Sequence, residues 1–397
     1  MWKLMTDNAI TQEERAILSE FILKEDRLSQ GDTVKEFENK WSEWLGCKYS
    51  VFVNSGSSAN LLLVHAVLSK KGNAHELYVK PNRWAAQACT WSTTVSPILQ
   101  GLAGAHDCLY LTDVDLNDFS PDLRQLEDFI VNDGINYLFL THLLGFPALS
   151  QELLDLCEKH DVFILEDCCE AHGATFQGRR VGTFGVGSTF SFYYGHHMTT
   201  IEGGMVCTND EEIYHKLLLL RSHGLLRELP PRERKKQELS SVDPAFCFVS
   251  DGYNLRNTEL HAKLGIMQLK GLDTSIEHRN KIFNVFLNNL NPDKYKTDFK
   301  TEGCSNFSLP LLVKDPYQIK DVKKILTGLE VEHRPCIAGN LNYHPLVQNQ
   351  KFKIPSFAQC SDYNADKIHR DCVYIGNHKD VTEDDVITVC KALGEIT

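Results

Sequence analysis

Short apolar segments separated by helical ones narrow the possible folds of this chain more than any other feature. YSVFV (49–53), YLFLT (137–141) and VFILE (162–166) contain almost only aliphatic, β-branched and aromatic residues. Between the last two, SQELLDLCEKHD (150–161) has the spacing of an amphipathic helix. Such buried strands alternating with helices are typical of a parallel sheet covered on both faces. We therefore expect an α/β fold.

Two helix starts can be predicted near the N-terminus. TQEERAILSEFI has Thr11 as a cap and Glu14 as its capping-box partner. TVKEFENKWSEWLG repeats this arrangement with Thr33 and Glu36, and Gly46 provides a stop.

The pattern changes after about residue 250. NTELHAKLGIMQLKGL (257–272) begins a long helix, FSLPLLV (307–313) reads as a strand, and the C-terminus is polar and helical. We expect a large α/β domain with the N-terminal helices at 1–250 and a smaller α+β domain at 251–397. KKGNAHELYVKPNRWAAQ (70–87) fits neither the helix nor the strand pattern.

Composition excludes several classes of partner. The net charge of −12 over 397 residues gives no basic surface for nucleic acid or an anionic membrane. The sequence shows no signal segment and no long apolar stretch. The 13 cysteines are scattered without a CxxC spacing, which indicates reduced thiols. We expect a cytoplasmic protein that binds neither nucleic acid nor membrane.

Ligands of an open α/β sheet bind beyond the carboxyl ends of its strands. NSGSSAN (54–60) falls there, and Gly56 with the hydroxyls of Ser57 and Ser58 could hold a phosphate at a helix N-terminus. Such turns are common and most bind nothing. Asp167 directly follows VFILE, at the rim of the sheet. Taken alone it reads as a helix cap, with Glu170 as its capping-box partner.

Together with SFYYGHHMTTIEGG, these motifs resemble a known family, the sugar-nucleotide aminotransferases among the fold type I pyridoxal phosphate (PLP) enzymes. The other matching segments, in order, are QGDTVKEFENKWSEWLG, CTWSTTVSPILQ, DVDLNDFSPD, LEDCCEAHGATFQGRRVGTFG, RSHG and GYNLRNTELHAKLGIMQL. The resemblance implies an aspartate-aminotransferase-like fold. Most members carry lysine at the sixth position of SFxxxK. Here Ser191 is the first position and His196 is the sixth.

Histidine at this position changes the expected chemistry. An imidazole cannot bind the cofactor aldehyde as a stable Schiff base, but it can carry a proton near neutral pH. The histidine version resembles a subgroup of 3-dehydratases, which use PLP and pyridoxamine phosphate (PMP). These remove the C3 hydroxyl of a nucleotide-linked 4-keto-6-deoxyhexose such as GDP-4-keto-6-deoxymannose, and L-glutamate regenerates PMP. The alternatives are an aminotransferase that tolerates histidine and a non-catalytic PLP-binding paralogue.

The resemblance also assigns the cofactor-binding residues. It implies that Asp167 pairs with the pyridine nitrogen, that Glu170 lies near the ring hydroxyl, and that Trp91 stacks on the ring. Trp91 could instead be a packing residue. The phosphate candidates are Gly56, Ser57, Ser58 and Ser191.

Further residues are implied around the substrate. Asn254 is expected to reach the phosphate of a neighbouring subunit, which predicts a homodimer with shared active sites. His223 is a second catalytic candidate, or else it caps a helix C-terminus. Arg256 and Arg334 are candidates for the sugar nucleotide, or else solvated. His197 is expected to be structural.

Iron is not expected. A relative that acts on CDP-sugars carries a [2Fe–2S] cluster and needs closely spaced cysteines after the histidine. In this chain the cysteines after Cys207 are far apart, so we predict neither a cluster nor another metal site.

Overall fold

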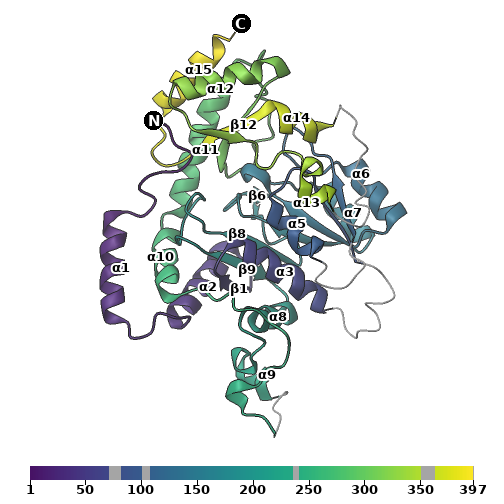
Figure 1. The fold of residues 1–397 in the computed structure, drawn as a ribbon, viewed down its shortest axis with the longest axis vertical. Coiled ribbons are helices and arrows are strands. Elements are labelled where there is room, and N and C mark those ends of the chain that lie inside the picture. Colours follow the sequence, from purple (N-terminus) through teal and green to yellow (C-terminus); the bar gives the residue numbers. More distant parts are fainter. Residues whose placement is uncertain (71–81, 101–107, 236–240, 350–362, 397) are drawn as a thin grey trace.

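A seven-stranded sheet lies at the centre of the computed structural model, which describes residues 1–70, 82–100, 108–235, 241–349 and 363–396 (Figure 1). The strand order is β1-β9-β8-β5-β4-β2-β3. β9 runs antiparallel to both neighbours, and all other strands of this sheet point the same way. The bounds are β1 Tyr49–Val53, β2 Arg83–Gln87, β3 Cys108–Thr112, β4 Tyr137–Thr141, β5 Phe163–Asp167, β8 Gly187–Ser191 and β9 Gly204–Thr208. The mostly parallel sheet predicted from the sequence is confirmed.

Helices cover both faces of this sheet, each over its own apolar core. One core lies under α3, α5 and α8 and continues to the small sheet; the other lies under α2, α6, α7 and α10. The bounds are α1 Gln12–Lys24, α2 Asp32–Leu45, α3 Gly56–Lys70, α5 Ser92–Leu99, α6 Leu123–Asp128, α7 Gln151–Lys159, α8 Glu211–Arg221, α9 Pro231–Lys235 and α10 Glu259–Leu269. Across the residues that the structure describes, no helix has the length and apolar character needed to cross a bilayer.

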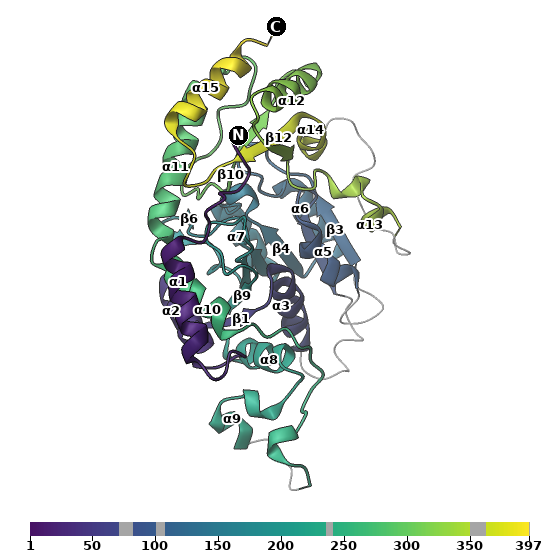
Figure 2. The same cartoon turned by 60° about the vertical axis from the view of Figure 1, so that its left-hand side comes forward.

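A second, three-stranded antiparallel sheet has the order β10-β12-β11. The 18-residue helix α11 connects the two parts and packs on α15 at the end where both termini lie (Figure 2). The bounds are α11 Leu272–Asn289, β10 Ser308–Leu312, α12 Ile319–Gly328, β11 His333–Pro335, α13 Pro345–Gln348, α14 Asn364–Asp371, β12 Cys372–Gly376 and α15 Glu383–Gly394; a two-stranded ribbon pairs β6 Thr175–Phe176 with β7 Arg179–Arg180. α10 packs against α1 and α2. The division into 1–250 and 251–397 stays a prediction.

Local sequence signals identify several of these elements correctly. Thr11 caps α1 in a capping box with Glu14, and Gly46 ends α2 in a left-handed conformation. The helix predicted from residue 257 is divided at Gly271 into α10 and α11. Of the segment that fitted no pattern, 83–87 forms β2, and 71–81 lies outside the described residues.

The predicted capping box at the start of α2 is wrong. The helix begins after Gly31, and no side chain of this segment caps it. Instead, the buried Glu259 carboxylate of α10 accepts hydrogen bonds from the N–H groups of Gly31 (2.7 Å), Thr33 (2.8 Å) and Val34 (3.0 Å). A negative charge at a helix N-terminus also interacts favourably with the helix dipole. Because the capping residue comes from 226 positions away, no local motif announces it.

Replacing Glu259 with glutamine is expected to destabilise the fold by about 1–3 kcal/mol, because the amide NH₂ would face a buried N–H donor. The matched control is Thr33→Ala, whose side chain makes no capping bond and which should change stability by no more than about 0.5 kcal/mol. Urea unfolding of both variants measures the difference. Equal losses in the two variants would contradict the role of Glu259.

Candidate active site

A cavity of about 200 Å³ lies at the carboxyl ends of β5 and β8, where the large sheet meets the small one. Most of the candidate residues line it: Gly56, Ser57, Trp91, Asp167, Glu170, Ser191, His196 and Arg334. Four other candidates do not line it: Ser58, His223, Asn254 and Arg256. Arg334 lies on β11 of the small sheet. The other lining candidates end or follow strands of the large sheet that point the same way, and they therefore meet at one edge of that sheet.

The turn between β1 and α3 forms one corner of the cavity. Ser55 Oγ caps α3 by accepting the N–H of Ser58 at 3.0 Å, which accounts for Ser58 lying outside the cavity wall. A Cβ on Gly56 would lie 2.5 Å from Cβ of Ser191. Glycine therefore lets the helix N-terminus approach β8 closely, and Ser57 and Ser191 present hydroxyls beside it. A phosphate fits this corner.

Gly56→Ala tests this corner. The added Cβ must displace Ser191, so we expect a loss of about 1–3 kcal/mol in stability together with weaker PLP binding. Gly328→Ala is the control, since a Cβ there meets nothing within 4 Å. Thermal unfolding and a PLP titration measure the two effects. Unchanged PLP affinity in Gly56→Ala would argue against a phosphate at this helix end.

Asp167 ends β5 with its carboxylate held by neutral donors. Thr94 Oγ1 donates to Oδ2 at 2.7 Å, Asn60 Nδ2 donates to Oδ2 at 3.0 Å, and the N–H of Cys169 donates to Oδ1 at 3.1 Å. The residue is only 4% exposed. No helix begins in the described residues directly after it, so the helix-cap interpretation of Asp167 and Glu170 is wrong. A buried carboxylate with no cationic partner in the described part of the chain suits a ligand that carries a positive charge there, such as a protonated pyridine nitrogen.

Glu170 is held as a carboxylic acid near neutral pH. Burial raises the pKa of Glu170 to about 8; the N–H of Leu144 opposes the rise and the charge of Asp167 adds to it. That N–H donates to Oε2 at 2.8 Å, from a turn in which Leu144 has φ 54°. A protonated carboxyl offers one donor and one acceptor, as a glutamine amide does. Neutral Glu170 can therefore donate a hydrogen bond to a ligand in the cavity.

His196 follows β8 of the large sheet. It lines the cavity on the side where Phe307 and Ser308 begin the small sheet. Its ring centroid lies 5.2 Å from that of Phe307 and 6.4 Å from that of Tyr193. Burial, and next the positive charge of Arg279, lower the pKa of His196 to about 3. The imidazole is therefore neutral at pH 7, the form that accepts a proton. Nδ1 is buried and has no hydrogen-bond partner among the described residues.

His197 is placed differently from its neighbour. It is buried outside the cavity wall, and its Nε2 lies 3.1 Å from both the carbonyl oxygen and the hydroxyl of Ser305. These contacts fit the expected structural role.

The remaining candidates form a separate surface group. Arg256 Nε donates to Asn254 Oδ1 at 3.0 Å, and its Nη2 lies 3.5 Å from Nε2 of His223. Along the chain they flank the segment that carries α9, which projects at the end of the molecule opposite α15 (Figures 1 and 2). His223 also follows the C-cap of α8 in a left-handed conformation (φ 62°), and the N–H of Gly224 donates to Leu219 O at 2.8 Å, so the structure fits the helix-cap alternative as well.

Two residues that donate to Asp167 and several that line the cavity were not anticipated. Asn60 lies one turn after Gly56 on α3, and Thr94 three positions after Trp91, so helical spacing could have indicated both. Leu4, Met5, Phe307 and Tyr374 come from the N-terminal segment and the small sheet, where no motif marks them. Met5 also packs over Gly195, where a Cβ would lie 2.6 Å from its sulfur. Trp91 is 54% exposed at the cavity, so it is not a core residue.

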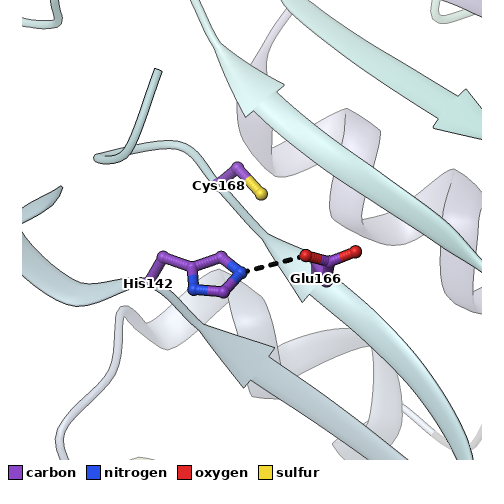
Figure 3. A group of neighbouring side chains, drawn as sticks. All are labelled: His142, Glu166 and Cys168. Atoms are coloured by element: carbon purple, nitrogen blue, oxygen red, sulfur yellow. Dashed lines mark hydrogen bonds and ion pairs between the residues drawn. The ribbon is translucent and has the colours of Figure 1, made fainter. Parts of the chain in front are cut away.

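A cluster of His142, Glu166 and Cys168 has the composition of a metal site but is already satisfied by the protein (Figure 3). Glu166 accepts three main-chain N–H groups at 2.7 Å, from Gly182, Phe184 and Gly185. It also lies 3.2 Å from Nε2 of His142, whose Nδ1 accepts the N–H of Ala148 at 3.0 Å. Glu166 points to the face of β5 opposite Asp167. We interpret the cluster as a structural network that fixes the loop after β7.

The cavity therefore fits a PLP-like cofactor: a helix N-terminus for the phosphate, a carboxylate for the ring nitrogen and an exposed tryptophan for the ring face. The model of the DegT/DnrJ/EryC1/StrS aminotransferase family matches residues 8–394. The chain belongs to this family. The aspartate-aminotransferase-like fold expected from the motifs is confirmed.

Named relatives within the family are similar over nearly the whole chain. GDP-4-keto-6-deoxy-D-mannose 3-dehydratase of Yersinia pseudotuberculosis is 33% identical over 366 residues, which is 90% of each chain. A solved structure of the E. coli GDP-4-keto-6-deoxy-D-mannose-3-dehydratase with bound hydrated PLP has a TM-score of 0.89, at 31% identity and 99% coverage of both chains. A GDP-4-keto-6-deoxymannose-3-dehydratase with a trapped PLP-glutamate geminal diamine has a TM-score of 0.88, at 30% identity, covering 99% of this chain and 100% of that one.

Proposed function

We propose that this member of the DegT/DnrJ/EryC1/StrS family is a PLP/PMP-dependent 3-dehydratase. It removes the C3 hydroxyl of GDP-4-keto-6-deoxymannose and yields a 3,6-dideoxy-4-keto sugar. The observation that carries this proposal is His196, a neutral imidazole at the lysine position of a cavity that otherwise fits the cofactor. The 3-dehydratases among its relatives supply the substrate class.

The residues that would hold the cofactor have distinct tasks. Gly56, Ser57 and Ser191 bind its phosphate, and Asp167 keeps its ring nitrogen protonated, with Trp91 on the ring face. When bound, the cofactor supplies an electron sink that allows the C3–O bond to break. Glu170, as a neutral acid, donates a hydrogen bond to the ring oxygen without adding charge.

His196 moves the proton. Nδ1 is buried, so we assign the transfer to Nε2. The neutral ring accepts a proton there and, once charged, can return it to the departing hydroxyl group. Positioned proton carriers of this kind contribute roughly 10²–10⁴-fold to a rate.

The aminotransferase alternative is disfavoured, because no lysine lines the cavity in the described part of the chain. A non-catalytic paralogue is disfavoured too, since Asp167, Glu170 and Ser191 are retained around an acid–base residue.

We also propose that the enzyme is a homodimer with shared active sites. His223, Asn254 and Arg256 lie outside the cavity of their own chain. Their polar groups would then complete the cavity of the neighbouring subunit. Arg334, on β11 in the cavity wall, would bind the sugar nucleotide from the same chain.

The test is a product analysis. The purified protein is incubated with PLP, L-glutamate and GDP-4-keto-6-deoxymannose, and the nucleotide sugars are identified by mass. We expect a sugar that has lost its C3 hydroxyl and kept its ketone, formed only when glutamate is present, and a slower reaction with the CDP-linked analogue. A 4-amino sugar with the C3 hydroxyl intact would instead identify an aminotransferase.

A further inference from the structure

Arg279 of α11 is a buried cation behind His196. It is 5% exposed, and among the described residues its guanidinium donates to main-chain carbonyl groups alone. Nη1 donates to Phe307 O at 3.0 Å and to Asn377 O, and Nη2 donates to His196 O at 3.4 Å. These contacts tie the backbone at the proton carrier to the small sheet.

No acidic side chain pairs with this guanidinium in the part of the chain that the structure describes. The groups whose pKa this charge lowers are imidazoles, those of His172, His196, His197 and His378. Glu14 and Lys379 line the same cavity as Arg279. Burial lowers the pKa of Arg279 to about 10, which leaves it charged at neutral pH. Burying a charge without a counter-ion costs folding free energy, which suggests that Arg279 has a functional role.

We propose that Arg279 is a positioning residue whose hydrogen bond fixes the backbone at His196 and whose charge weakens the hold of the imidazole on a proton, so that the proton is passed on to the leaving hydroxyl. This inference rests on the proposed function of His196 as the proton carrier.

Electrostatics gives the direction of the effect. A nearby positive charge disfavours a second one, and after burial it is the next cause that lowers the pKa of His196. The pKa values of His172 and His197 are lowered as well, first by burial and then also by the charge of Arg279. The same repulsion favours release of the proton once His196 has accepted it. Arg279 would thus make His196 a weaker base and assist the delivery of the proton to the leaving hydroxyl.

The test measures the protonation of His196 in the cofactor-free protein by NMR of labelled histidine rings. The His196 signal is assigned from its loss in His196→Asn. In Arg279→Met we expect the midpoint of the His196 titration to rise by about one pH unit. Arg279→Lys keeps the charge and should leave the midpoint near that of the unmodified protein.

A second pair of variants leaves Arg279 in place. Ser275 lies one turn before Arg279 on α11, and both line a cavity that also borders His196. Ser275→Asp places a carboxylate next to the guanidinium and should raise the His196 midpoint in the same direction. Ser275→Asn is the matched uncharged control and should not.

The acid limb of kcat/KM should move upward by the same amount in Arg279→Met and Ser275→Asp. If Arg279→Met does not fold, the comparison of Ser275→Asp with Ser275→Asn tests the proposal by itself. Equal midpoints in Ser275→Asp and Ser275→Asn, or an equal rise in Arg279→Lys and Arg279→Met, would overturn the proposal. The titration needs neither cofactor nor substrate. A failed dehydration assay would therefore count against the proposed function but not against the effect of Arg279 on His196.

Discussion

Replacing His196 with asparagine is expected to slow dehydration by roughly 10²–10⁴-fold while PLP still binds. Asparagine can occupy the space beside Phe307 and Tyr193, but it cannot accept and return a proton. Asp167, Gly56 and Trp91 would be unchanged, so the binding of the cofactor should be retained. Single-turnover measurements with the PMP form separate the loss of chemistry from the regeneration of the cofactor.

His223→Asn is the comparison for this experiment. In the structure His223 lies outside the cavity of its own chain, next to Arg256. We expect a smaller loss, caused by weaker substrate binding at the neighbouring site. If His196→Asn dehydrates the substrate at the normal rate and His223→Asn is inactive, the proton carrier is His223.

Asp167→Asn is expected to have the second large effect. The amide is neutral and brings an NH₂ group among three donors, those of Thr94, Asn60 and Cys169. The ring nitrogen would lose the charge that keeps it protonated. We expect a loss of roughly 10⁴-fold, the size seen when a carboxylate that stabilises a protonated heterocycle becomes an amide.

Thr94→Val is its graded control. It removes one donor at 2.7 Å and leaves the carboxylate in place, so dehydration should fall far less. The absorbance of bound PLP reports the environment of the ring in both variants. Normal activity in Asp167→Asn would show that the carboxylate does not serve the cofactor.

The parts of the fold that could be predicted are those with local causes. YSVFV, YLFLT and VFILE are strands because runs of such residues are stable only in a covered sheet. Their carboxyl ends meet at one edge, and therefore Gly56, Asp167 and His196 come together although they are far apart in the sequence.

Other features depend on contacts between distant segments and leave no local pattern. Glu259 caps α2 from another helix, and Arg279 reaches His196 from α11. Met5 enters the cavity from the N-terminal segment. The reversed direction of β9 also has no signature, since GMVCT (204–208) reads like any buried strand. The surface position of Asn254 and Arg256 is set by how the chain turns after α8, which a motif match does not specify.

Borohydride reduction tests most directly whether a histidine has replaced the lysine that binds the cofactor. The protein and its His196→Lys variant are each loaded with PLP, reduced and digested, and the peptide that contains residue 196 is analysed by mass. We predict an unmodified peptide from the natural chain, and a pyridoxyl group on the new lysine in His196→Lys, together with slower dehydration. A stoichiometric pyridoxyl-lysine at a single site of the natural chain would contradict the account.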